Sequence, residues 1–108
     1  MAMTFLSRPN LLLVVQGTFD DAVDRSDFDR WYDEKHLPQI SACPGFEWGL
    51  RYYAVEHERR FLTIYGLADA DALRTPEFTS RRGFDQFTAA VDFRTTLYRA
   101  HSISETSA

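Results

Sequence analysis

Cysteine, lysine and long apolar runs are scarce in this chain, and each scarcity narrows its possible roles. Cys43 is the single cysteine, so no internal disulfide can form, and we expect it to be a small buried side chain. Lys35 is the single lysine among twelve basic residues, which reflects a compositional bias. The net charge of -4 argues against a nucleic-acid partner, because binding to a phosphate backbone requires a basic face.

Several sequence signatures of cofactor and catalytic sites are also missing. The five glycines are scattered, so there is no glycine-rich phosphate loop, and no Gly-x-Ser-x-Gly elbow occurs. His36, His57 and His101 do not have the spacing of metal ligands. We therefore expect neither a metal site nor any other bound cofactor.

No stretch of the chain is apolar for long enough to span a membrane. The apolar run over residues 11–15 is also too short for the core of a signal peptide. We expect a loose leader over residues 1–10, one domain over residues 11–102 and a polar tail over residues 103–108. These features favour a cytoplasmic protein without a membrane partner.

The spacing of apolar residues predicts the element order β-α-β-β-α-β. The first strand is almost continuously apolar, which is typical of a strand buried on both faces. Ser26 or Asp27 is expected to cap the first helix, which Pro38 should kink. The expected strands cover residues 11–19, 46–56, 60–67 and 93–102, and the helices cover residues 27–43, 68–74 and 75–91, the last capped by Thr75 and broken at Gly83.

This order is that of an α+β protein with the ferredoxin-like fold, in which two helices cover one face of a four-stranded antiparallel sheet. In the second strand Trp48, Leu50 and Tyr52 point to one side, and Arg51 and Tyr53 point to the other. Both sides therefore carry large apolar groups. A face this apolar is not left in water, so we expect a homodimer with the two sheets facing one another as an α/β barrel.

One histidine lies on the apolar side of the first predicted helix. A spacing of four residues aligns Phe28, Tyr32, His36 and Ile40 in one stripe. An imidazole at such a position is either a packed core group or a proton-transfer group in a pocket wall. The spacing alone favours packing.

The chain resembles the dimeric α/β-barrel superfamily, in particular its small EthD-like members, from Leu11 to Ser102. The resemblance is carried by the motifs Trp31-Tyr32-x-x-x-His36-x-Pro38, Pro44-Gly45-Phe46 and Thr75-Pro76-Glu77-Phe78. Superfamily members include muconolactone isomerases, polyketide cyclases, cofactor-free quinone-forming monooxygenases and haem-using relatives. The resemblance implies a pocket between sheet and helices that uses a histidine and tyrosines.

The resemblance also implies roles for individual residues. His36 is similar to the catalytic histidine of the methylmuconolactone isomerase branch, which shifts the interpretation of this residue from packing to catalysis. The tyrosine of that branch would fall near Gly49, so Tyr53, on the same strand face, becomes the second catalytic candidate. Gly49 would leave room for a ligand, or it marks a β-bulge. Arg51 would bind a carboxylate or enolate oxygen, or it forms an interface salt bridge.

Three further tyrosines are candidates for substrate binding. Tyr32, Tyr65 and Tyr98 could each direct a hydroxyl into the pocket, and each could equally be a core aromatic with a solvated tip. Together these features favour an enzyme: a cofactor-independent lyase, isomerase or cyclase that uses His36 as general acid/base on a small hydrophobic or aromatic substrate. The alternatives are a cofactor-free quinone-forming monooxygenase and a non-catalytic ligand-binding dimer.

Overall fold

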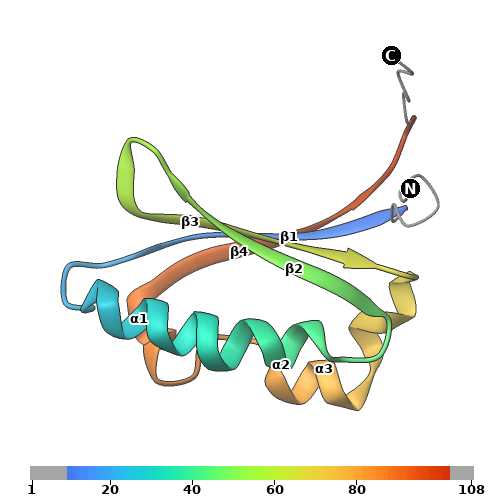
Figure 1. Cartoon of the computed structure of the whole chain (residues 1–108), viewed down its shortest axis with the longest axis horizontal. Coiled ribbons are helices and arrows are strands. Elements are labelled where there is room, and N and C mark those ends of the chain that lie inside the picture. Colours follow the sequence, from blue (N-terminus) through green and yellow to red (C-terminus); the bar gives the residue numbers. More distant parts are fainter. Residues whose placement is uncertain (1–9, 103–108) are drawn as a thin grey trace.

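A four-stranded antiparallel sheet carries the helical segments on one of its faces and leaves the other face open (Figure 1). The computed structural model describes residues 10–102, so the predictions for a leader and a tail lie outside the described residues, apart from Asn10. This architecture confirms the predicted ferredoxin-like α+β class. The sheet order is β2-β3-β1-β4, with strands β1 (Leu11–Phe19), β2 (Phe46–Ala54), β3 (His57–Leu67) and β4 (Val91–Arg99).

The strand register assigns each side chain to one of the two faces. Arg51 pairs with Thr63 and Thr63 with Val15, so these three share the face toward the helices. Leu50 and Ile64 form the corresponding row on the open face. The side chains of β1 are therefore buried on the helix side of the sheet and mostly half-buried on the open side. The prediction that β1 is buried on both faces does not hold within one chain.

The first helical region is divided into three segments. They are α1 (Arg25–Trp31), the π-helical η2 (Tyr32–His36) and α2 (Leu37–Ser41). Asp24, rather than Ser26 or Asp27, is the N-cap, because its carboxylate accepts hydrogen bonds from both of those backbone N–H groups. The region therefore begins two residues earlier than the sequence indicated.

The π turn has a simple cause. Pro38 has no N–H to donate, and in a regular α-helix its ring would clash with the carbonyl four residues earlier, at Glu34. Instead the N–H of Leu37 bonds to the carbonyl of Tyr32, five residues earlier, and the turn widens. The predicted kink at Pro38 is thus replaced by a local expansion of the helix.

The second helical region is shorter and less regular than predicted. Thr75 caps α3 as expected, since its hydroxyl accepts a hydrogen bond from the N–H of Phe78 at 3.1 Å. Gly83 (φ +104°) and Asp85 (φ +48°) then take left-handed conformations that end the α-helix, and a separate 3-10 helix starts at Asp85. The three segments are η3 (Ala70–Arg74), α3 (Pro76–Arg81) and the 3-10 helix η4 (Asp85–Ala90).

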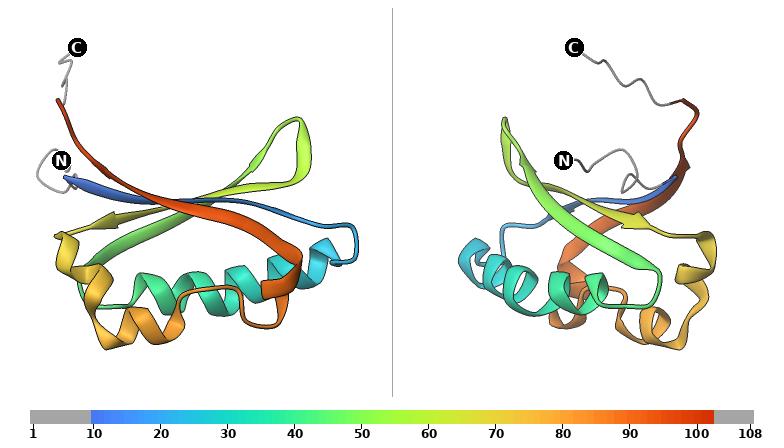
Figure 2. Two further views of the ribbon diagram at one scale, coloured as in Figure 1. Left: turned by 180° about the vertical axis from the view of Figure 1, so that it is seen from behind. Right: turned by 45° about the vertical axis from the view of Figure 1, so that its right-hand side comes forward.

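The limits of three strands also differ from the predictions, and β2 ends at Ala54 rather than residue 56. The hairpin turn consists of Val55 and Glu56, since Ala54 pairs with His57, so β3 begins three residues earlier than predicted. The β2–β3 hairpin curls away from the helix layer (Figure 2). β4 likewise begins at Val91 rather than residue 93 and ends at Arg99. No helix within residues 10–102 is long and apolar enough to cross a membrane.

Aromatic rings fill the space between the helices and the sheet. Phe28 is fully buried, and its ring lies 4.5 Å from that of Phe19 and 5.5 Å from that of Phe61. Phe84, from the loop after α3, packs against the same cluster. Burial of one such side chain contributes roughly 1.5–3 kcal/mol, so this cluster fixes the helix against the sheet.

Two glycines with left-handed backbones permit a matched test of the close contact between Gly45 and Ala72. Gly45 has φ +87°, and a Cβ there would lie 2.6 Å from the Cβ of Ala72, whereas a Cβ at Gly83 would meet nothing within 4 Å. Gly83→Ala should cost about 1–2 kcal/mol of unfolding free energy through its backbone alone. Gly45→Ala should cost roughly 1–3 kcal/mol more, through the added clash. Urea denaturation measures both; equal losses would contradict the predicted contact.

Candidate functional site

His36 lines a cavity of about 410 Å³ between the first helical region and the sheet. The imidazole is only 6% exposed, and Phe28, Tyr32 and Ile40 are buried on the same side, as the stripe predicted. The cavity wall is mostly apolar and aromatic, which is typical of small-molecule sites. It consists of Leu13, Val15, Tyr32, His36, Ile40, Tyr65, Leu73, Phe78, Arg82, Gly83, Phe84, Phe93 and Thr95.

The π turn sets the orientation of the imidazole. The rings of Trp31 and His36 are stacked, with centroids 4.6 Å apart and planes 14° apart. Residues five apart lie above one another only where the helix is widened, because in an α-helix that alignment belongs to residues three and four apart. Tyr32 meets the imidazole edge-on at 5.1 Å. The imidazole is therefore held between two aromatic rings.

The cavity keeps His36 uncharged. Burial lowers its pKa from 6.5 to about 4, and the nearby Asp85 carboxylate opposes this shift only in part. Neither ring nitrogen has a hydrogen-bond partner within residues 10–102. At neutral pH the site thus presents a neutral imidazole that can accept a proton.

Two phenol groups accompany the imidazole. The hydroxyl of Tyr32 is 2.7 Å from Oγ1 of Thr63, and burial raises the pKa of Tyr32 to about 12. Tyr65 is 2% exposed, and its hydroxyl has no hydrogen-bond partner among the described residues. Burial, with the neighbouring Tyr32, raises the pKa of Tyr65 well above its usual value. Both tyrosines are therefore neutral phenols at the cavity, and the Tyr65 hydroxyl can donate a hydrogen bond to a ligand.

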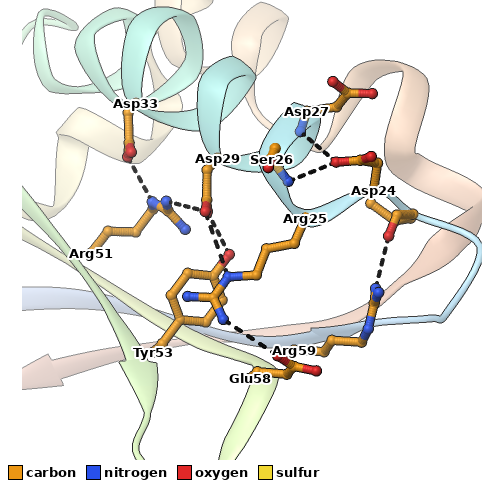
Figure 3. Close-up of polar contacts among 11 residues, drawn as sticks. Asp24, Arg25, Ser26, Asp27, Asp29, Asp33, Arg51, Tyr53, Glu58 and Arg59 are labelled. Carbon is orange, nitrogen blue, oxygen red and sulfur yellow. Dashed lines mark hydrogen bonds and ion pairs between the residues drawn. The ribbon is translucent and has the colours of Figure 1, made fainter.

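Arg51 and Tyr53 share the helix-facing side of β2, and neither lines this cavity. Figure 3 shows both side chains directed toward Asp29 of the first helix. The Nε of Arg51 donates to Asp33 at 2.9 Å, and its Nη2 donates to Asp29 at 2.8 Å. The hydroxyl of Tyr53 donates to the same oxygen of Asp29 at 2.6 Å. Both groups thus serve a polar cluster that joins the helix to the second strand.

The charges in this cluster reinforce one another. Burial by itself would raise the pKa of Asp29, but hydrogen bonds from Tyr53 and Arg51 hold it below its usual value. Burial likewise works against the charged form of Arg51, and the carboxylates of Asp33 and Asp29 overcome this and raise its pKa. Arg51 is consequently engaged by ion pairs within the chain, between the first helical region and β2. The expected alternative was a salt bridge at an interface.

Two other predicted site residues lie outside the cavity wall. A Cβ at Gly49 would lie 2.7 Å from Oγ of Ser41 and 2.9 Å from the Tyr65 ring, so the glycine leaves room for that ring rather than directly for a ligand. Tyr98 stands on the open face, paired with Leu12, and is 53% exposed. The structure therefore groups His36 with Tyr32 and Tyr65 and separates them from the remaining candidates.

Sequence reasoning missed several cavity residues on distant segments. Arg82, Gly83 and Phe84 come from the loop after α3, and Phe93 and Thr95 come from β4. In the sequence, the pair Arg81-Arg82 beside Gly83 is the one visible sign of this contribution. Among the described residues no three His, Cys, Asp or Glu side chains gather in a metal-binding arrangement.

Comparison with solved structures identifies the fold. SnoaB, a cofactor-independent oxygenase from Streptomyces nogalater, superposes with a TM-score of 0.72 at 16% identity, over 89% of this chain and 97% of its own. An antibiotic biosynthesis monooxygenase gives 0.66 at 16% identity, over 85% and 99%. An EthD family protein from Bacillus halodurans gives 0.59 at 14% identity, over 79% and 96%.

The chain has the fold of these ferredoxin-like proteins. The resemblance seen in its motifs is thereby confirmed at the level of structure. No sequence model of a known family matches the chain, and no curated protein matches it in sequence. A shared fold does not by itself imply a function, so the chemistry must be argued from the cavity itself.

The lowered pKa of His36 predicts a dependence of stability on pH. Between pH 6.5 and about 4 the unfolded chain binds a proton that the folded protein excludes. The contribution of His36 to the free energy of unfolding is therefore fully present above pH 6.5. It falls by about 3 kcal/mol as the pH decreases from 6.5 to about 4. Denaturation curves across this range should show the loss in the native protein, whereas His36→Gln should remove this part of the slope. Parallel curves for the two proteins would contradict a buried neutral imidazole.

Proposed function

We propose that the cavity binds a small hydrophobic or aromatic molecule that carries a hydroxyl or a carbonyl group. His36 removes a proton from that hydroxyl or from the carbon next to that carbonyl. One observation carries this proposal: a neutral imidazole and the unpartnered, buried hydroxyl of Tyr65 line the same apolar cavity. A buried hydroxyl without a partner costs roughly 1–3 kcal/mol, so such groups are rare in folded proteins. A ligand oxygen would satisfy it.

Each polar group in the cavity has a distinct chemical task. His36 accepts the proton, and Trp31, stacked on its ring, keeps the imidazole in position. Tyr65 donates a hydrogen bond to the oxygen on which negative charge develops. The carboxylate of Asp85 favours the imidazolium that forms. Tyr65 thus takes the role that the resemblance had suggested for Tyr53.

The reaction completed by this proton transfer is an isomerisation, cyclisation or elimination. In each of these the imidazolium of His36 returns its proton to another atom of the substrate, so the proton balance closes without a further reactant. The same site could also bind a ligand without turning it over. In that case His36 would serve only as a packed wall of the cavity.

Oxygenation is a second candidate, favoured by the similarity to SnoaB, which is described as a cofactor-independent oxygenase. It begins with the same deprotonation. An electron-rich phenolate then reduces molecular oxygen: one oxygen atom becomes the new carbonyl of a quinone, and the other leaves as water together with the two hydrogens lost by the phenol. The proposed role of His36 is common to both candidates.

1-Naphthol is a suitable probe, since it can undergo both reactions. Under argon in D2O, proton transfer exchanges its ring hydrogens next to and opposite the hydroxyl, which NMR detects. In air, oxygenation gives 1,4-naphthoquinone and water, with oxygen uptake. His36→Gln should lower either rate by roughly 10²–10⁴-fold. Tyr65→Phe should lower it by roughly 10²-fold while the fold is retained.

Tyr53→Phe is the matched control, since it removes a phenol hydroxyl that lies outside the cavity. It should weaken stability and leave the rate unchanged. Wild-type rates in His36→Gln, with circular dichroism showing an intact fold, would overturn the proposed catalysis and leave a binding role.

We also propose that two chains associate through the open sheet face. Leu50, Tyr52 and Tyr98 on this face are about half exposed in the single chain, and Val14 and Ile64 lie between them in register. Monomeric proteins rarely leave so continuous an apolar surface in water. A two-fold dimer with the sheets face to face would bury it.

Light scattering should therefore give twice the mass of one chain, which is 12.5 kDa. Leu50→Arg places a charge among the apolar side chains of the open face, on the edge strand β2, and should shift the protein to a monomer or to aggregates. Ala42→Arg adds the same charge at the end of α2, in the helix layer, and should leave the dimer intact. A soluble monomer of the native chain would refute the proposed association.

A further inference from the structure

We propose that Arg82 is a specificity residue, and that the substrate is an aromatic anion whose acidic group binds at the mouth of the His36 cavity. This inference rests on the function proposed above. Arg82 contributes the only cationic side chain to the cavity wall within the described residues. Its guanidinium is exposed and has no ion-pair partner among residues 10–102.

The local backbone keeps Arg82 at this position. Its N–H donates to the carbonyl of Phe78 at 3.0 Å, which ends α3, and its own backbone is extended. Gly83 then turns the chain through a left-handed conformation, and Phe84 enters the core. The long side chain of Arg82 is thus left at the exposed rim, directly beside a deeply anchored ring.

Nearby charges do not neutralise this guanidinium. The closest acidic residue in sequence is Asp85, whose carboxylate pairs with Lys35 at 3.7 Å. Arg51, which the sequence suggested as the anion-binding group, is held by Asp29 and Asp33. Arg82, without an ion-pair partner among residues 10–102, is free to bind a carboxylate, whereas Arg51 is not.

The distribution of polar groups along the cavity gives the shape of the ligand. His36 and Tyr65 are buried, Arg82 is exposed, and apolar side chains such as Leu13, Ile40 and Phe93 lie along the wall. A matching ligand has a flat apolar ring system with an ionisable hydroxyl at one end and an acidic group at the other. The hydroxyl would meet His36, and the acid would meet Arg82 at the rim.

A pair of probes that differ only in charge tests this inference. 6-Hydroxy-2-naphthoate and its methyl ester carry the hydroxyl and the acid at opposite ends, and their fluorescence or calorimetry gives a Kd for each. The native protein should bind the acid about ten-fold more tightly than the ester, with a preference that shrinks as salt is added. Arg82→Gln should abolish the preference, and Arg82→Lys should restore part of it.

Arg81→Gln is the matched control, because this neighbouring arginine lies outside the cavity wall. It should leave the preference for the acid intact. Tyr65→Phe should weaken the binding of both probes by the same factor, since both would place their hydroxyl in the cavity.

The possible failures can be told apart. Equal affinity for acid and ester in the native protein, or a preference that survives Arg82→Gln, would overturn the inference and leave the proposed function standing. Binding of neither probe, or binding that Tyr65→Phe does not weaken, would overturn the proposed function and this inference with it.

Discussion

Pro38 cannot donate a hydrogen bond to the carbonyl of Glu34, and the first helical region responds by widening into a π turn that ends at His36. This local expansion stacks the imidazole on Trp31 and holds it at the cavity wall. A regular α-helix would separate those two rings around its axis. The geometry of the candidate site therefore follows from a backbone constraint imposed two residues beyond the histidine.

Burial and charge divide the polar groups of the helix-facing side into two sets. On one side Nε and Nη2 of Arg51 pair with Asp33 and Asp29, and the cluster joins the first helical region to the second strand. On the other side His36 and Tyr65 stay neutral in an apolar cavity and have no hydrogen-bond partners within residues 10–102. The first set stabilises the fold, while the second lines the cavity, where a ligand can reach it.

The amphipathic stripe and the strand parity were enough to predict much of this arrangement. Both depend on local periodicity, so the inward placement of His36 and the common side of Arg51 and Tyr53 could be obtained from residue spacing. The partners of those side chains could not. Asp29 lies on the polar side of the predicted helix, and nothing in its spacing indicates that it meets Arg51 and Tyr53 across the interface between helix and sheet.

The sequence by itself determined the order of the elements, the ferredoxin-like class and the face on which His36 lies, since each follows from patterns within a few residues. The tertiary structure alone decided that Tyr65 joins Tyr32 beside the histidine, which arginine is free and where Phe84 and Thr95 complete the wall. These are contacts between segments distant in the chain. They depend on strand order, on the widened helix turn and on the left-handed conformations at Gly83 and Asp85, none of which has a local periodic signal.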